Sequence, residues 1–353
     1  MGKAKGAMAM QPPQRVVAHA PGRATILGDH TDHQRGLVLP FALARGVTVT
    51  AVRTGARTVE VLGLDVAAED RFPLDDVPSA PPGDWRAYVR GTLAEMERHA
   101  GPLPGMRLTV TGDLPIGAGL SSSAALSSAV ALAALAVSGA EEMERFLLAA
   151  VLRRVEWEWA GVRTGLMDQL AVLVSSTGHA LLADMATLET RDVAMDGARF
   201  AGRDTGRRSV ADGRYRQRLE ECAVAARHLG LPDLHAAAPA DADGLPPMLA
   251  GRVRHVVTEN ARVRAGATAL EDGDLRGLGA LMDESHRSLR DDFDVSTPDA
   301  DAACEAAHRD GALGARIMGA GFGGTVIALW EGSPPPDWTS LDPGRPAWAE
   351  VVR

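Results

Sequence analysis

The stretch PIGAGLSSSAAL, residues 115–126, joins two glycines to a run of serines and then to a long segment of small apolar side chains. Gly117 and Gly119 allow the backbone to take positive φ angles and to approach a ligand closely, so that successive N–H groups can converge on it. The segment after this loop is expected to be a helix. The free N–H groups and partial positive charge at the start of a helix suit a phosphate group.

Three serines, Ser121, Ser122 and Ser123, stand where this helix is expected to begin. Their hydroxyls offer further hydrogen-bond donors to a phosphate, or a ligand for Mg²⁺ bound to it. The alternative is a plain Gly/Ser turn with an N-cap serine. The stretch matches neither the Walker A loop nor the dinucleotide-binding fingerprint.

Sequence patterns predict a strand-rich first half and a helix-rich second half. Strands are expected at residues 15–20, 46–53, 106–112 and 179–184, and on both sides of the glycine turn 319–325. Helices are expected at residues 85–100, 142–161, 214–229, 247–270, 274–290 and 298–309, besides the one after the glycine loop. Because no βαβ unit repeats at a fixed period, the fold class is expected to be α+β. A chain of 353 residues exceeds one ordinary core, so we expect two domains, 11–190 and 191–353.

The composition excludes several classes of partner. The net charge is −9, whereas binding to nucleic acid or to an anionic membrane needs a basic surface. No apolar run reaches the ~18 residues of a membrane span. Cys222 and Cys304 lie far apart in no metal-binding or redox pattern, which predicts free thiols and a cytoplasmic protein. Lys3 and Lys5, the only lysines, lie in a segment expected to be a disordered tail or a remnant of expression.

Three motifs, in this order, resemble those of the GHMP kinases, the superfamily of galactokinase, homoserine kinase, mevalonate kinase and phosphomevalonate kinase. APGRATILGDHTDH is similar to the galactokinase signature, PIGAGLSSSAAL to the second superfamily motif, and GARIMGAGFGGT to the third. The segments GLMDQ, RHVVTENAR and ESHRSLRDDFDVSTPDAD also resemble galactokinase segments. Together the matches run from about Arg15 to Leu329, nearly the whole chain.

This resemblance implies an architecture and an activity. The architecture is an N-terminal mixed sheet with helices and a C-terminal helix-rich α/β sandwich, with the active site between them. The activity is the ATP- and Mg²⁺-dependent phosphorylation of the anomeric hydroxyl of a sugar, galactose first. The implied partners are therefore a small sugar and ATP, and either a monomer or a homodimer is compatible with the sequence.

Asp168 lies in TGLMDQLAVLVSS among apolar neighbours, where a carboxylate is costly unless it is paired. One interpretation is a residue at the beginning of a helix. By resemblance, Asp168 matches the catalytic carboxylate of the family, and Arg23 its basic partner at the anomeric hydroxyl. Asp168 could accept the proton of the attacking hydroxyl, or it could orient that hydroxyl electrostatically, and the sequence leaves both roles open.

Two further residues are assigned to the nucleotide side of the site. Glu156, in LRRVEWEWAG, could be a solvated helix charge paired with Arg153. By resemblance it matches the acid associated with Mg²⁺, which it would hold together with Ser123. Trp85, in DWRAYVRG, matches a family tryptophan near the adenine site, and its alternative role is in the core.

The loop GDHTDHQRG, residues 28–36, crowds two carboxylates and two imidazoles between glycines. A metal site would need further ligands, and no other Cys/His cluster is present. Sugar hydroxyls both donate and accept, and charged acceptors discriminate their configuration. By resemblance, the sugar pocket is lined by Asp29, His30, Asp32, Gly165 and Tyr215.

Three residues depart from the galactokinase pattern. Thr25 and His33 replace a usual Asn and Tyr, and Asp29 is shorter by a methylene than the usual Glu. One hypothesis is therefore a kinase for another sugar, namely a heptose, an octose, a uronate or a pentose, with Asp29 leaving room for a C6 substituent. Another is a non-catalytic galactokinase-like sensor, although the phosphate loop and Asp168 are both present.

Overall fold

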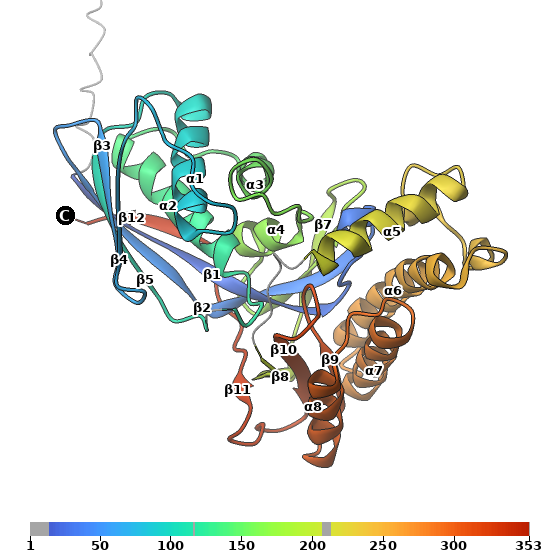
Figure 1. The fold of residues 1–353 in the computed structure, drawn as a ribbon. Helices are drawn as coiled ribbons and strands as arrows, with labels where there is room; N and C mark the ends of the chain where they lie inside the picture. The colour runs from blue at the N-terminus through green and yellow to red at the C-terminus, as the bar shows by residue number, and fades with distance from the viewer. Residues whose placement is uncertain (1–13, 116, 207–212, 353) are drawn as a thin grey trace, which may run out of the picture.

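The computed structural model describes residues 14–115, 117–206 and 213–352. The predicted N-terminal tail with Lys3 and Lys5 lies outside these residues. The described residues form two sheets with helices packed on each (Figure 1).

The larger sheet is built on two long antiparallel strands, β1 (Arg15–Leu27) and β2 (Leu37–Arg53). The strand order is β12-β1-β2-β5-β3-β4, with β6 pairing β2 and β7. The other strands are β3 (Thr58–Gly63), β4 (Ala68–Pro73), β5 (Met106–Gly112), β6 (His179–Asp184), β7 (Thr190–Ala194) and β12 (Trp348–Val351). Among the strand pairs of the described residues, β3–β5 is the one parallel pair, so the sheet is mixed. The predicted strands are all present, but β1 and β2 extend well beyond them.

Four helices cover one face of this sheet (Figure 1). They are α1 (Trp85–Ala100), α2 (Ser122–Ser138), α3 (Arg145–Arg154) and α4 (Met167–Val174). Asp84 caps α1 by accepting a hydrogen bond from the N–H of Arg86, as N-cap residues do. The small side chains of α2 let it pack closely against β1 and β2, where most of its residues are fully buried. The helix expected over 142–161 ends at Arg154 and continues as a π-helical turn, Val155–Trp159.

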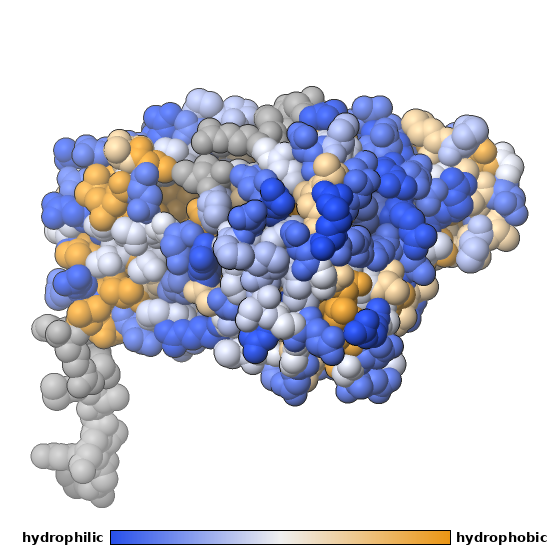
Figure 2. Space-filling view, turned by 90° about the horizontal axis from the view of Figure 1, so that it is seen from below, coloured by the Kyte–Doolittle hydropathy of each residue, from blue (hydrophilic) through white to orange (hydrophobic). Residues whose placement is uncertain are grey.

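The opposite face of the larger sheet contacts solvent at the end where β3 and β12 lie. Figure 2, seen from this side, shows hydrophobic side chains there, interrupted by hydrophilic ones. Its exposed large apolar residues include Val52 on β2 and Leu62 on β3. A largely antiparallel sheet tolerates this arrangement because only one of its faces must be buried.

The smaller sheet has the order β11-β8-β10-β9. Its strands are β8 (Arg199–Asp204), β9 (Gly314–Ile317), β10 (Thr325–Trp330) and β11 (Thr339–Ser340). The helices of this half are α5 (Arg214–His228), α6 (Pro247–Glu271), α7 (Leu275–Asp291) and α8 (Pro298–Arg309), close to the predicted ranges. The predicted strand, glycine turn and strand around residues 319–325 are also confirmed.

The N-terminal half, with the larger sheet, and the C-terminal half, with the smaller sheet, contact each other. A second apolar cluster lies between the smaller sheet and helices α5–α8, apart from the core of the larger sheet. Helix α6 also packs against β1, β2 and β7, and the last strand, β12, pairs with β1. The α+β class is confirmed, whereas the division into 11–190 and 191–353 stays a prediction. No helix among the described residues is long and apolar enough to cross a membrane.

Candidate active site

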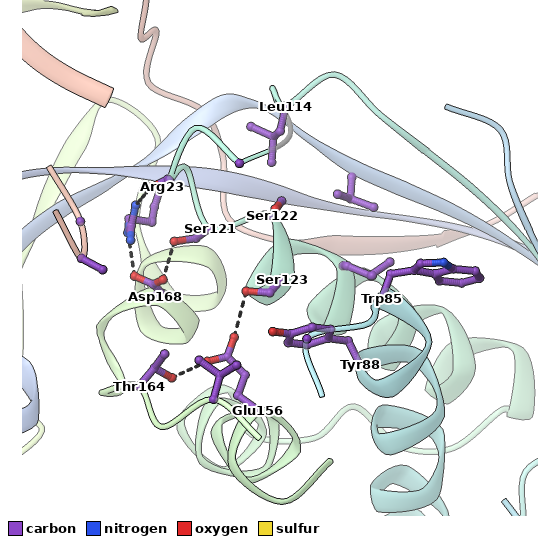
Figure 3. A pocket seen from close by; sticks show the side chains of 18 of the residues that line it. Arg23, Trp85, Tyr88, Leu114, Ser121, Ser122, Ser123, Glu156, Thr164 and Asp168 are labelled. Atoms are coloured by element: carbon purple, nitrogen blue, oxygen red, sulfur yellow. Dashed lines mark hydrogen bonds and ion pairs between the residues drawn. The ribbon is translucent and has the colours of Figure 1, made fainter. Parts of the chain in front are cut away.

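We call the loop GDHTDHQRG, residues 28–36, the sugar-loop candidate. A cavity of about 790 Å³ opens where this loop, the glycine-rich loop before α2 and the first turns of α2 and α4 meet (Figure 3). All predicted site residues line it: Arg23, Asp29, His30, Asp32, Trp85, Gly117, Gly119, Ser121, Ser122, Ser123, Glu156, Gly165, Asp168 and Tyr215. These residues come from positions far apart in the chain, so the fold itself brings them together.

Asp168 is held on both of its carboxylate oxygens. Arg23 donates from Nε to Oδ1 at 2.7 Å, and Ser121 donates from Oγ to Oδ2 at 2.5 Å (Figure 3). The guanidinium of Arg23 also donates to the carbonyl of Gly119 at 2.6 Å. Asp168 lies in the first turn of α4, where a carboxylate interacts favourably with the helix dipole, and its side chain is 21% exposed. Asp168 is therefore both a first-turn residue of a helix and part of the cavity wall.

Glu156 is a buried carboxylate beside the glycine-rich loop and the first turn of α2. It accepts a hydrogen bond from Ser123 Oγ at 3.0 Å and another from the hydroxyl of Thr164. Burial raises the pKa of Glu156 to about 7. The alternative interpretation as a solvated charge is wrong for Glu156 and describes Glu158 instead, which pairs with Arg154 at 3.2 Å.

Helix α1 supplies an aromatic wall. Trp85 and Tyr88 both line the cavity from its first turn, on the side of Glu156 (Figure 3). Burial, followed by the charge of Glu156, raises the pKa of the Tyr88 hydroxyl above its usual range. The sequence analysis missed Tyr88, although it follows Trp85 at helical spacing.

Asp29 is tied to the third glycine-rich motif. Its Oδ2 accepts a hydrogen bond from Nη2 of Arg316 at 2.5 Å, and the two side chains are 2% and 0% exposed. Arg316 also donates to the carbonyl of Ile26 at 2.8 Å. Burial nevertheless raises the pKa of Asp29, against the opposing effect of Arg316. The sequence analysis missed Arg316, whose signal was a charged residue inside the apolar strand GARIM.

Three side chains of α6 form hydrogen bonds with the backbone of the sugar-loop candidate and of the residue after it. Glu259 accepts from the N–H of Gly28 at 2.8 Å, and Asn260 accepts from the N–H of Leu37 at 2.8 Å. His255 lies 3.1 Å from the carbonyl oxygen of Asp29 and is neutral, since burial lowers its pKa to about 4. The loop is therefore fixed by polar contacts at its first two residues and just after its last residue.

Asp32 and Gly165 fit each other closely. A β-carbon on Gly165 would lie 1.8 Å from Oδ2 of Asp32, so only glycine leaves room for this carboxylate. Asp32 also accepts from the N–H of His33 at 2.9 Å. Beside them, the ring of His30 lies 5.7 Å from that of Tyr215 and 4.6 Å from that of Phe293.

Known protein families match this chain along most of its length. The profile of the GHMP kinases N terminal domain matches residues 87–176, that of the GHMP kinases C terminal matches 267–336, and the galactokinase galactose-binding signature matches 8–53. A galactokinase of Mycobacterium tuberculosis (strain ATCC 25618 / H37Rv) is 41% identical over 324 residues, which cover 88% of this chain and 87% of that protein. The chain belongs to the galactokinase family of GHMP kinases. The resemblance inferred from the motifs is thereby confirmed.

Two further galactokinases and a mevalonate kinase are also similar to this chain. A galactokinase of Roseiflexus sp. (strain RS-1) is 38% identical, with 90% of this chain and 84% of that protein covered. The crystal structure of Lactococcus lactis galactokinase complexed with galactose superposes with a TM-score of 0.88 at 26% identity, with 95% of each chain covered. Methanococcus jannaschii mevalonate kinase shares the fold, with a TM-score of 0.68 at 18% identity and 92% of each chain covered.

The galactokinase family implies Mg²⁺, and the donor set near Glu156 fits this ion. Mg²⁺ in phosphoryl-transfer sites is held by one or two carboxylates together with substrate phosphates and waters. One carboxylate, that of Glu156, and one hydroxyl, that of Ser123, would supply the protein oxygens for the ion at the cavity wall. Among the described residues no cluster of three His, Cys, Asp or Glu side chains is placed to hold a metal.

Replacement of Asp32 by asparagine is expected to flatten the dependence of stability on pH. Burial, followed by the charge of Asp168, raises the pKa of Asp32 from 3.8 to about 7. Between these values the folded protein keeps a proton that the unfolded chain has released, so the free energy of unfolding falls as the pH rises from about 4 to about 7. Asparagine does not titrate, and its protein should show a smaller fall. Urea denaturation of both proteins between about pH 5 and pH 8 measures this, and equal slopes would contradict it.

Proposed function

We propose that this chain is an ATP-dependent sugar kinase that phosphorylates galactose at its anomeric hydroxyl. The observation that carries the proposal is the position of Asp168, which lies between the loop with Asp29 and Asp32 and the glycine-rich loop that opens α2. Membership of the galactokinase family supports it, because the relatives named above are galactokinases.

The residues on the two sides of Asp168 suit an acceptor and a donor of a phosphoryl group. Arg23 pairs with Asp168 and orients it toward the acceptor hydroxyl, and its charge can stabilise the transferring phosphoryl group. On the donor side, the first N–H groups of α2 bind the phosphates of ATP. Trp85 and Tyr88 flank the adenine end of the cavity. Mg²⁺, bound by Ser123 and Glu156, would neutralise charge on the phosphates.

The charges of the sugar end favour a neutral sugar. Three carboxylates, those of Asp29, Asp32 and Asp168, line this end of the cavity. Asp29 and Asp168 are already paired with Arg316 and Arg23, so the carboxylate of a uronate would be buried there without a counter-charge of its own, at an energetic cost. Hydroxyl groups, in contrast, donate to carboxylates in short, strong hydrogen bonds.

The three departures from the galactokinase pattern differ in their bearing on specificity. Thr25 is fully buried and its Oγ donates to Sδ of Met167 at 3.7 Å, so it belongs to the packing behind the cavity. His33 lies beside the rings of Tyr215 and Phe293. The carboxylate of Asp29 lies in the cavity wall, and one of its oxygens accepts a hydrogen bond from Arg316. Asp29 is therefore the departure that bears most directly on which sugar fits.

Measurement of ADP release with Mg·ATP across free sugars tests the proposal. We expect turnover with galactose and none with galacturonate, with glucose, arabinose and heptoses compared in the same assay. Turnover with a heptose alone would keep the phosphoryl transfer and replace galactose as the substrate. Absence of turnover with every sugar, while ATP and galactose both bind in calorimetry, would overturn the kinase proposal in favour of a non-catalytic sensor.

A further inference from the structure

Ser121 occupies the N-cap position of α2, but its hydroxyl does not cap the helix. An N-cap serine ordinarily accepts a hydrogen bond from a backbone N–H of the first helical turn. Here the hydroxyl turns away from that turn and donates to Oδ2 of Asp168 at 2.5 Å (Figure 3). The side chain therefore forms its hydrogen bond with Asp168 and not with the backbone of the helix that it precedes.

The backbone of Ser121 is held in a conformation that glycine adopts more easily. Its φ and ψ angles are 59° and 45°, in the left-handed region. A residue with a β-carbon is disfavoured there, by roughly 1–2 kcal/mol, whereas glycine is not. Glycine would thus satisfy the loop geometry at this position, and what serine adds is the hydroxyl.

The hydroxyl completes the set of contacts that fixes the Asp168 carboxylate. Arg23 binds Oδ1, and the same guanidinium is anchored to the carbonyl of Gly119, two residues before Ser121. The N–H of Arg23 also donates to the carbonyl of Leu120 at 3.1 Å. With a donor on each oxygen, the carboxylate cannot rotate about its Cβ–Cγ bond without losing a contact. Each oxygen keeps a second lone pair for an acceptor hydroxyl.

The neighbouring serines have different environments. Ser123 donates to Glu156, the candidate Mg²⁺ carboxylate. Ser122 lines the cavity as the first residue of α2, the position at which a bound phosphate meets the helix N-terminus. The proton of the Ser121 hydroxyl is already donated to Asp168, so this hydroxyl is not a free donor to a phosphate.

We propose that Ser121 is a positioning residue that orients Asp168 toward the acceptor hydroxyl, and that its side chain is not a phosphate ligand. This inference rests on the proposed kinase activity, since orientation of Asp168 has a measurable effect only on phosphoryl transfer. It replaces the assignment of the Ser121 side chain to ATP binding, and leaves that of its backbone unchanged.

Two variants separate the hydroxyl from the backbone conformation. Ser121→Gly removes the hydroxyl and tolerates the left-handed backbone, whereas Ser121→Ala removes the hydroxyl and keeps the strain. We expect both variants to reduce kcat by about 10- to 100-fold, the effect of losing one hydrogen bond to a charged group. The KM values for ATP and the sugar should change by less than about threefold, because binding is not the step affected.

The control is Ser138→Ala at the other end of α2, where the hydroxyl donates to the carbonyl of Leu135. Its kcat should equal that of the wild type. In addition, Ser121→Gly should cost nothing further in a protein that already carries Asp168→Asn, since residues that act as a unit are not additive.

Three results would overturn the inference. A raised KM for ATP with unchanged kcat would make the Ser121 side chain a phosphate ligand. Wild-type kcat in Ser121→Gly, with a loss only in Ser121→Ala, would assign the effect to the backbone. Full additivity with Asp168→Asn would separate the two residues. Failure of the proposed function gives a different result, because the wild type itself would then turn over no sugar.

Discussion

Asp168→Asn is expected to reduce kcat by about 10²- to 10⁴-fold, the range found when a group that accepts or orients a reacting proton is lost. Asparagine keeps the shape of the side chain but removes its charge, and presents an NH₂ group on one side. The ion pair with Arg23 Nε and the acceptor for Ser121 Oγ are lost or weakened together. Arg23 is then left without its counter-charge at the point where the acceptor hydroxyl meets the phosphoryl group.

Steady-state kinetics with Mg·ATP and the sugar identified in the panel measure this effect. Asp75→Asn is the matched control, because Asp75 lies in an exposed ion pair with Arg57 and such pairs contribute little. Calorimetry should show that the variant still binds ATP, which separates a catalytic loss from a folding defect. A kcat within about threefold of the wild type would remove Asp168 from the reaction.

The glycine-rich motifs and the acidic residues of the site could be predicted from the sequence because they are local signals. The loop before α2 needs positive φ at Gly117 and Gly119, and both glycines have it. Gly165 precedes Asp168 by three residues, so their proximity follows from the chain itself. The resemblance to galactokinases then supplied the order in which these local pieces meet.

The contacts behind the site could not be predicted in the same way. Arg316 reaches Asp29 across 287 positions of the chain, and Glu259 reaches the Gly28 amide across 231. Such pairings depend on how β9 and α6 pack against β1 and β2, which no local pattern determines. A charge inside an apolar strand or on a helix indicates only that it needs a partner, not which partner it has.

Arg316→Met is expected to destabilise the folded protein by about 3–5 kcal/mol, the range for removal of one partner from a buried ion pair. Methionine fills a similar volume, so the main loss is electrostatic. Asp29 keeps a buried charge without its guanidinium, and the carbonyls of Thr25 and Ile26 lose a donor. Equilibrium urea denaturation measures the free energy of unfolding, with Arg276→Met as the control because that arginine and its partner Glu331 are both exposed.

A second substitution distinguishes loss of the ion pair from loss of packing. In the double variant Arg316→Met with Asp29→Asn no buried charge is left unpaired, so the stability lost in Arg316→Met should be partly recovered. The double variant should bind the sugar more weakly than the wild type does, because the Asp29 carboxylate in the cavity wall is gone. If the two substitutions destabilise additively instead, the effect of Arg316 lies in its packing and its bonds to β1. Recovery of stability without recovery of sugar binding would show that the Arg316–Asp29 pair serves two ends, burying the third glycine-rich motif against β1 and keeping one carboxylate at the sugar.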